Sequence, residues 1–145
     1  MSGGAMDRRG FCRTLPALAV GVGTLGTAAC GGAAYLVPRS VGGRLVVSTA
    51  DLAGATAVFL THPSSDRPIF LHRAASGEWS AVHARCTHRG CQPEPVGERL
   101  VCPCHGSEFE LDGALLEGPA ATGLTRYPVA VDGTDVVVTV AGGGS

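Results

Sequence analysis

Cys-Thr-His-Arg-Gly-Cys at residues 86–91 and Cys-Pro-Cys-His-Gly-Ser at residues 102–107 are the most informative stretches of this 145-residue chain. Each places a Cys and a His close together, and thiolate sulfur and imidazole nitrogen are common ligands of transition metals in proteins. Two such loops brought together offer a Cys pair and a His pair, which neither loop supplies alone. The candidate metal ligands are Cys86, His88, Cys102 and His105.

Three kinds of site use these residue types. The four candidates satisfy the preference of structural zinc for nitrogen and sulfur ligands, but zinc leaves the second Cys of each loop, Cys91 and Cys104, unexplained. A domain held by disulfides alone leaves both histidines unused. An iron–sulfur cluster is the third possibility.

Together the two stretches resemble the cluster-binding loops of Rieske proteins, in which two Cys and two His hold a [2Fe-2S] cluster. The resemblance implies one cluster per chain, with Cys86, His88, Cys102 and His105 as its ligands. It also implies a disulfide between Cys91 and Cys104 that ties the loops over the cluster. Rieske ferredoxins and ring-hydroxylating oxygenases usually lack this extra pair, so the chain resembles the quinol-oxidising and exported branch.

Histidine ligation has two consequences for redox chemistry. With two thiolates instead of four, the oxidised cluster carries no net charge and accepts an electron more readily. Reduction raises the basicity of the two imidazoles, which couples electron uptake to proton uptake. Both properties suit a partner that releases electrons and protons together, such as a quinol.

Further residues match or depart from the family pattern. Ser107 matches a serine that donates a hydrogen bond to a cluster sulfide, and Pro119 lies in a stretch resembling the proline loop that covers the cluster. Phe109 stands where high-potential members carry a hydrogen-bonding Tyr, so we expect a midpoint potential below that of a typical cytochrome bc Rieske centre. Arg89 stands where bc-type proteins prefer Leu, which changes the expected docking face.

Outside the two loops the chain has the pattern of an all-β protein. Runs of β-branched residues bounded by Gly, Pro and Asp predict strands at residues 44–48, 56–61, 68–73, 79–85, 127–131 and 135–140. We expect the first four to form a meander, with a turn at Ser76-Gly77, and the last two to form a hairpin around Asp132-Gly133. The resemblance implies that these strands form the Rieske fold, with an antiparallel base domain over residues 44–140 and a cluster-binding insertion at residues 86–122.

Composition excludes some functions. A formal net charge of −1 gives no basic field for nucleic acid, and no nucleotide-binding motif or candidate nucleophile is evident. We expect His62, His72 and His83 to be ordinary strand or loop histidines, and Glu108 and Glu110 to be exposed on one face of a strand.

Residues 1–38 resemble an export signal. Arg8, Arg9 and Phe11 match the twin-arginine pattern, and no charged residue follows from Thr14 through Pro38. The alternative is a chance pair of arginines before a buried helix. It explains less well why the stretch after the arginines has no polar face. Three outcomes remain open: lipidation of Cys30 at a lipobox-like sequence, cleavage to a soluble form, or an uncleaved span over residues 15–37. The Gly-rich tail, residues 141–145, is expected to be disordered.

These observations predict a one-electron carrier at the outer face of a bacterial cytoplasmic membrane. The resemblance implies the iron–sulfur subunit of a cytochrome bc-type, quinol-oxidising complex or a free-standing relative. Its expected partners are cytochrome b- or c-type or quinol-oxidising subunits, with membrane attachment through the N-terminal anchor or lipid. A ferredoxin-like donor to an oxygenase and a structural zinc module are the alternatives.

Overall fold

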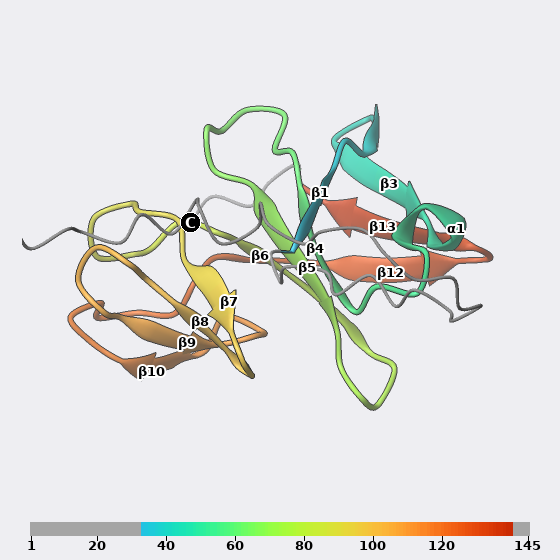
Figure 1. Ribbon diagram of the computed structural model, residues 1–145. Coiled ribbons are helices and arrows are strands. Elements are labelled where there is room, and N and C mark those ends of the chain that lie inside the picture. The colour runs from blue at the N-terminus through green and yellow to red at the C-terminus, as the bar shows by residue number, and fades with distance from the viewer. Residues whose placement is uncertain (1–32, 141–145) are drawn as a thin grey trace, which may run out of the picture. The chain divides into compact units, whose positions relative to one another are not determined.

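The computed structural model describes residues 33–140, which form strands and one short helix, so the prediction of an all-β protein is confirmed (Figure 1). The elements are β1 (Ala34–Leu36), β2 (Arg39–Val41), β3 (Arg44–Ser48), α1 (Thr49–Leu52), β4 (Ala57–Leu60), β5 (Ile69–Arg73), β6 (Trp79–His83), β7 (Glu94–Val96), β8 (Arg99–Val101), β9 (Glu108–Glu110), β10 (Leu115–Glu117), β11 (Arg126–Tyr127), β12 (Val129–Asp132) and β13 (Asp135–Thr139). The export signal, Cys30 and the C-terminal tail lie outside the described residues. Within residues 33–140, no helix is long and apolar enough to cross a membrane.

The strands form three sheets. The central sheet has the order β1-β4-β5-β6-β11, the hairpin sheet β12-β13-β3-β2, and the insertion sheet β10-β9-β8-β7. Neighbouring strands are antiparallel except for β1, which pairs in parallel with β4. In Figure 1 the insertion sheet lies on one side of β4, β5 and β6, and the hairpin sheet lies on the other.

The central sheet is buried on both faces. Alternate residues of a strand point to opposite faces, so Val58 and Leu60 of β4 pack into one core while Phe59 packs into the other. The first core is shared with the hairpin sheet and contains Leu45, Val47, Leu52, Val58, Leu60, Ile69, Leu71, Ala81, Tyr127, Val136 and Val138. The second core is shared with the insertion sheet and contains Phe59, Phe70, Val82, Ala84, Cys86, Leu100, Cys102, Phe109, Ala120 and Leu124. Two candidate ligands therefore belong to the second core.

The predicted four-strand meander is wrong for its first strand. Strands β4, β5 and β6 are consecutive neighbours, but β3 pairs with β13 in the hairpin sheet. Helix α1 follows β3 directly, capped by the Ser48 side chain, which accepts a hydrogen bond from the Ala50 backbone N–H at 3.2 Å. Ala53 then adopts a left-handed conformation, with φ of 48°, and the chain leaves the hairpin sheet for the central one.

Two strands precede the predicted domain. Residues 34–36 form β1, although they had been counted in the export segment and the possible membrane span, and residues 39–41 form β2. The all-antiparallel expectation is corrected by the parallel pairing of β1 with β4. Strands of three residues show too little alternation to be detected in the sequence.

The predicted C-terminal hairpin is confirmed with a small change in its turn. Asp132 still pairs with Asp135, so the turn residues are Gly133 and Thr134. Gly133 takes a positive φ of 58°, as the first central residue of a tight hairpin turn requires.

The cluster-binding insertion has a sheet of its own. Residues 86–122, for which no separate sheet is predicted, contain all four strands of the insertion sheet. Each of these strands has three residues. Only the middle residues of β8 and β9, Leu100 and Phe109, are buried, and in β9 Glu108 and Glu110 flank the buried ring. Glu110 is exposed as expected, whereas Glu108 is only partly exposed and pairs with Arg99. Cys102 and His105 lie in the turn that joins β8 to β9, whereas Cys86 and His88 lie between β6 of the central sheet and β7.

Candidate metal centre

The site is built from three loops. The first loop (residues 86–91) follows β6, the second (residues 102–107) joins β8 to β9, and the third (residues 118–123) joins β10 to β11. The first and second loops share one backbone hydrogen-bond pattern. In each, the first residue's N–H donates to the carbonyl of the sixth, at 2.8 Å, and the fifth residue's N–H donates back to the carbonyl of the first.

A glycine makes this pattern possible in both loops. Gly90 and Gly106 are the fifth residues, and both have a φ of 77°, which is favourable for Gly and strained for other residues. The two loops are therefore equivalent in backbone conformation, although their Cys and His residues occupy different positions. The shared Gly at position five is a signal that was readable in the sequence.

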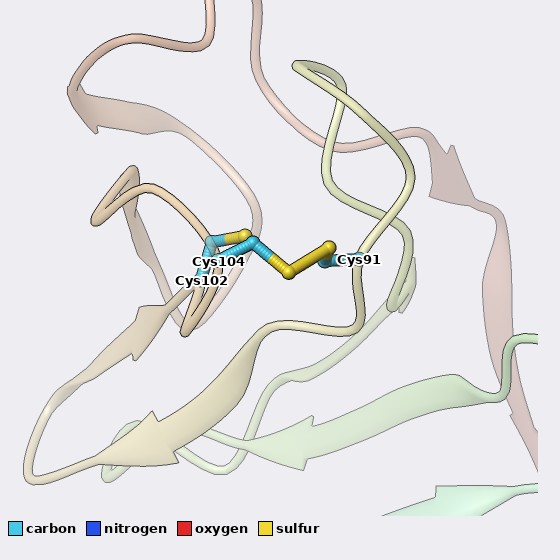
Figure 2. A group of neighbouring side chains, drawn as sticks. All are labelled: Cys91, Cys102 and Cys104. Carbon is cyan, nitrogen blue, oxygen red and sulfur yellow. A yellow bond between two sulfur atoms is a disulfide. The ribbon is translucent and has the colours of Figure 1, made fainter.

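The three loops are joined to one another in pairs. A disulfide between Cys91 and Cys104 links the first and second loops, as predicted (Figure 2). The Thr87 hydroxyl donates to the Thr122 carbonyl at 2.7 Å, which links the first and third loops. The second and third are linked by the Ala120 N–H, which donates to the Ser107 hydroxyl at 3.0 Å.

The four candidate ligands meet between the first two loops. The Cys86 and Cys102 side chains are 3% and 1% exposed, and their thiols lie within interaction distance of each other. The rings of His88 and His105 lie edge to face, with centroids 4.7 Å apart. His105 is exposed and His88 is half-buried, while both cysteines are buried, so the thiols face the second core and the His105 ring reaches the surface.

The surroundings of Cys102 determine how its thiol ionises. Burial raises its pKa, and the neighbouring Cys86 thiol adds to the increase. The backbone N–H groups of Cys104 and His105 act in the opposite direction, because they stabilise a negative sulfur. These donors suit a thiolate that is held in its ionised form by a metal.

The chemistry of these donors fits the cluster. The Sγ atoms of Cys91, Cys102 and Cys104 lie within 4.8 Å of one another, but two of them form the disulfide, so only Cys102 of this group offers a thiolate (Figure 2). The remaining sulfur donor is Cys86, which gives a pair. Nδ1 of His88 is buried without a hydrogen-bond partner in the described part of the chain, as expected for a metal-binding nitrogen. Two thiols and two imidazoles therefore match the mixed ligation of a [2Fe-2S] cluster.

The residues predicted to tune the cluster lie around this group. Ser107 is fully buried, and its hydroxyl accepts the Ala120 N–H, which leaves its own proton for another acceptor. Phe109 is also fully buried and packs in the second core with both thiols. Pro119 is exposed in the third loop, next to the buried Ala120.

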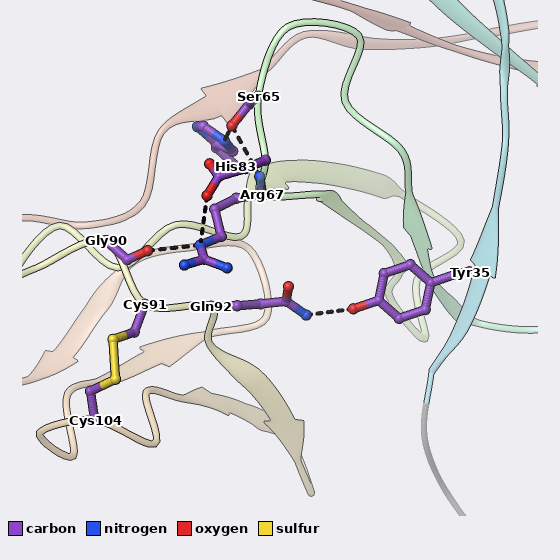
Figure 3. A network of polar contacts seen from close by, with 9 residues as sticks. Tyr35, Ser65, Arg67, His83, Gly90, Cys91, Gln92 and Cys104 are labelled. Atoms are coloured by element: carbon purple, nitrogen blue, oxygen red, sulfur yellow. Dashed lines mark hydrogen bonds and ion pairs between the residues drawn. A yellow bond between two sulfur atoms is a disulfide. The ribbon is translucent and has the colours of Figure 1, made fainter.

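Arg67, Gln92 and Tyr35 support the first loop and the segment that follows it (Figure 3). None of the three was predicted from the sequence. The Arg67 guanidinium donates through Nε to the Gly90 carbonyl at 2.9 Å. Gln92, which follows the disulfide, donates to the Tyr35 hydroxyl at 2.6 Å. Tyr35 comes from β1, and its ring stacks on Phe59 with centroids 5.0 Å apart. Neither contact has a sequence signal, because the partners are 23 and 57 residues apart.

The other histidines lie in a separate group. His62 Nε2 is 3.1 Å from the Tyr127 hydroxyl, and His83 Nε2 is 3.0 Å from the Ser65 hydroxyl. Burial lowers the pKa of His62 and of His83, and for His83 the nearby His62 and Arg85 lower it further. Burial also lowers the pKa of His72 in β5. His62 and His83 hold the loop between β4 and β5 against β11 and β6, and the lowered pKa values favour neutral imidazoles near pH 7.

Comparisons with known proteins agree with this geometry. Residues 44–128 match the sequence model of the Rieske [2Fe-2S] domain. The cytochrome b6-f complex iron–sulfur subunit of Synechococcus sp. (strain JA-3-3Ab) is 32% identical over 148 residues, covering 90% of this chain and 86% of that protein. The ubiquinol-cytochrome c reductase iron–sulfur subunit of Blastochloris viridis is 39% identical over 70 residues, covering 44% of this chain and 38% of that protein.

A solved structure is similar as well. The cyanobacterial plasma membrane Rieske protein PetC3 from Synechocystis PCC 6803 superposes with a TM-score of 0.55 and 36% sequence identity. The match covers 63% of this chain and 93% of that one.

Proposed function

This chain belongs to the Rieske [2Fe-2S] domain family, and from that premise we propose that it transfers single electrons at the outer face of a bacterial cytoplasmic membrane, as the iron–sulfur subunit of a quinol-oxidising cytochrome bc-type complex or as a free-standing relative. Its cofactor is one [2Fe-2S] cluster. The observation that carries the proposal is the pairing of two buried thiols with two facing imidazoles between loops joined by a disulfide.

We assign the ligands by the two sides of the site. Cys86 and Cys102 would hold a [2Fe-2S] cluster from the buried side, and His88 and His105 would complete its ligands. The unpartnered Nδ1 of His88 is the nitrogen that would bind the metal. The cluster would accept and release one electron reversibly.

The residues around the site determine how the cluster would exchange an electron with a partner. The buried thiols and the second core exclude water from the sulfur side, which strengthens each hydrogen bond there. His105 is exposed, so its ring gives a partner access to the surface side of the site. A histidine ring nitrogen that is not bound to metal can hold or release a proton near neutral pH, and this suits a partner that delivers an electron with a proton.

The location and partner rest on several observations. The disulfide is stable in an exported protein but not in a reducing cytoplasm. The paired arginines Arg8 and Arg9 support export, and Cys30 is the candidate lipidation site. The similar proteins from Synechococcus and Blastochloris are subunits of a cytochrome b6-f complex and a ubiquinol-cytochrome c reductase.

A redox titration of the full chain, purified with its cluster and followed by electron paramagnetic resonance, tests the function. We expect a reduced signal with the low average g value of mixed His and Cys ligation, and a midpoint that falls as pH rises. A high midpoint supports quinol oxidation, and a low one supports a ferredoxin-like donor instead. Stoichiometric zinc and no reduced signal would contradict electron transfer.

Removal of the buried hydroxyl by Ser107→Ala is expected to lower the midpoint. A hydrogen bond to the cluster stabilises the reduced, more negative state, and its loss corresponds to roughly 50–100 mV for one electron. The titration above measures the change. Ser80→Ala, which removes a partly buried hydroxyl from β6, is the control and should leave the midpoint unchanged. Equal midpoints in both variants would show that Ser107 does not contact the cluster.

Phe109→Tyr is expected to act in the opposite direction. The Phe109 ring is fully buried in the same core as the two thiols, so a hydroxyl added to it can donate toward a ligand sulfur. One such hydrogen bond should raise the midpoint by roughly 50 mV. A variant that loses stability without a change in midpoint would show that the new hydroxyl finds no acceptor at the cluster.

A further inference from the structure

A shallow hollow of about 610 Å³ lies beside the first loop. Its lining includes two candidate ligands, Cys86 and His88, and two arginines, Arg85 and Arg89. Thr122 of the third loop contributes as well. The hollow is therefore next to the surface side of the cluster site.

The charge of this hollow is positive. Arg85 and Arg89 are exposed, and neither takes part in an ion pair within residues 33–140. The lining contains no Asp or Glu, and none occurs in the first, second or third loop. His83 also lines the hollow, but its lowered pKa leaves it neutral near pH 7, so the charge comes from the two arginines.

The backbone of the first loop limits the mobility of one of these arginines. The Arg85 guanidinium packs against Gly90, with Nε 3.2 Å from the position that a Cβ on this residue would take. Arg67 donates to the carbonyl of the same glycine. A guanidinium already held over the loop loses less side-chain entropy when it pairs with an anion than a freely extended one does.

We propose that Arg85 and Arg89 form a cationic docking face for a redox protein whose contact surface is acidic. The proposal rests on the proposed electron-transfer function, because a partner that exchanges electrons must approach the ligands, and His88 lines the same hollow as the two arginines. Carboxylates on such a partner meet two guanidinium groups in a lining that contains no Asp or Glu, and Asp66, which acts on His83, lies outside that lining. Complementary charge of this kind accelerates association at low ionic strength.

The test uses two forms of one haem protein. One is native cytochrome c, which is basic, and the other is cytochrome c with succinylated lysines, which is acidic. Each is mixed with the reduced full-length holoprotein, and haem reduction is followed by stopped flow. We expect the acidic form to react faster at low salt, with a rate that falls as salt increases. Arg89→Gln should slow the acidic form roughly 3- to 10-fold at low salt and should not slow the basic form.

Two variants separate docking from other causes. Arg89→Lys keeps the charge and should retain most of the rate. Arg44→Gln, which removes an exposed arginine from β3 in the hairpin sheet, makes the same change in net charge and should leave the rates unchanged. Loss of a positive charge near the cluster lowers its midpoint potential, which by itself would make electron donation faster. A slower reaction of Arg89→Gln than of the parent protein therefore reports weaker docking.

Each outcome has a distinct meaning. Holoprotein with a normal reduced signal, but with the same rate in Arg89→Gln and Arg44→Gln, would overturn the docking face and leave the electron-transfer function standing. Absence of the signal would overturn the function itself. Competition by vesicles of anionic lipid that requires Arg89 would assign the face to a membrane surface instead and would overturn the protein partner.

Discussion

Replacement of either buried thiol, by Cys86→Ser or Cys102→Ser, is expected to abolish the cluster. Each sulfur is almost fully buried, and no other free thiol is available in residues 33–140, because the remaining two cysteines form the disulfide. A hydroxyl binds iron far less well than a thiolate, which is the ligand that holds these clusters. Iron and acid-labile sulfide per chain, together with the visible absorption, measure the loss.

The histidines provide a matched comparison. His88→Gln is expected to lose the cluster or to leave a labile one, because it removes the unpartnered Nδ1 that faces the site. His62→Gln removes an imidazole whose ring contacts Tyr127 and His83 instead, and should keep a full complement of iron. Full iron content with an unchanged electron paramagnetic resonance spectrum in His88→Gln would refute the ligand assignment. Stoichiometric zinc in the parent protein would point to a structural metal site.

Removal of the disulfide by the double change Cys91→Ala, Cys104→Ala is the second large effect. The bridge joins residues 13 apart and closes a loop that contains β7 and β8. A cross-link over a loop of about this length stabilises a protein by roughly 3 kcal/mol, mainly by restricting the unfolded chain. The same bridge holds the first and second loops together, so the variant should also lose its cluster sooner during storage or heating.

Urea unfolding of the holoprotein measures the loss of stability, and the decay of visible absorption measures the loss of the cluster. Reductant should reproduce both in the parent protein and should change nothing further in the double variant. Thr87→Val removes the hydrogen bond between the first and third loops and is expected to cost roughly 1 kcal/mol of stability. The loss in the double variant is compared with this smaller loss. A double variant as stable as the parent would show that hydrogen bonds alone hold the loops together.

The sequence by itself determined the chemistry of the site. Both ligand loops are contiguous, and their conformation depends on local features such as Gly90 and Gly106, which close the same hydrogen-bonded turn. The candidate ligands and the two disulfide cysteines are therefore readable within two six-residue stretches. The same holds for the C-terminal hairpin, where Gly133 supplies the positive φ that the two-residue turn requires.

Only the tertiary structure decided how the sheets are partnered. β3 pairs with β13, which is distant in the sequence, because the apolar face of β3 is covered only when the hairpin sheet packs on the central one. β1 and the insertion strands are too short to show a period of two, so their pairing depends on burial against distant residues. The contacts of Arg67 with Gly90 and of Tyr35 with Gln92 also depend on segments that are distant in the sequence. Local hydrogen bonding is encoded by neighbouring residues, whereas burial of both faces of a sheet depends on the whole chain.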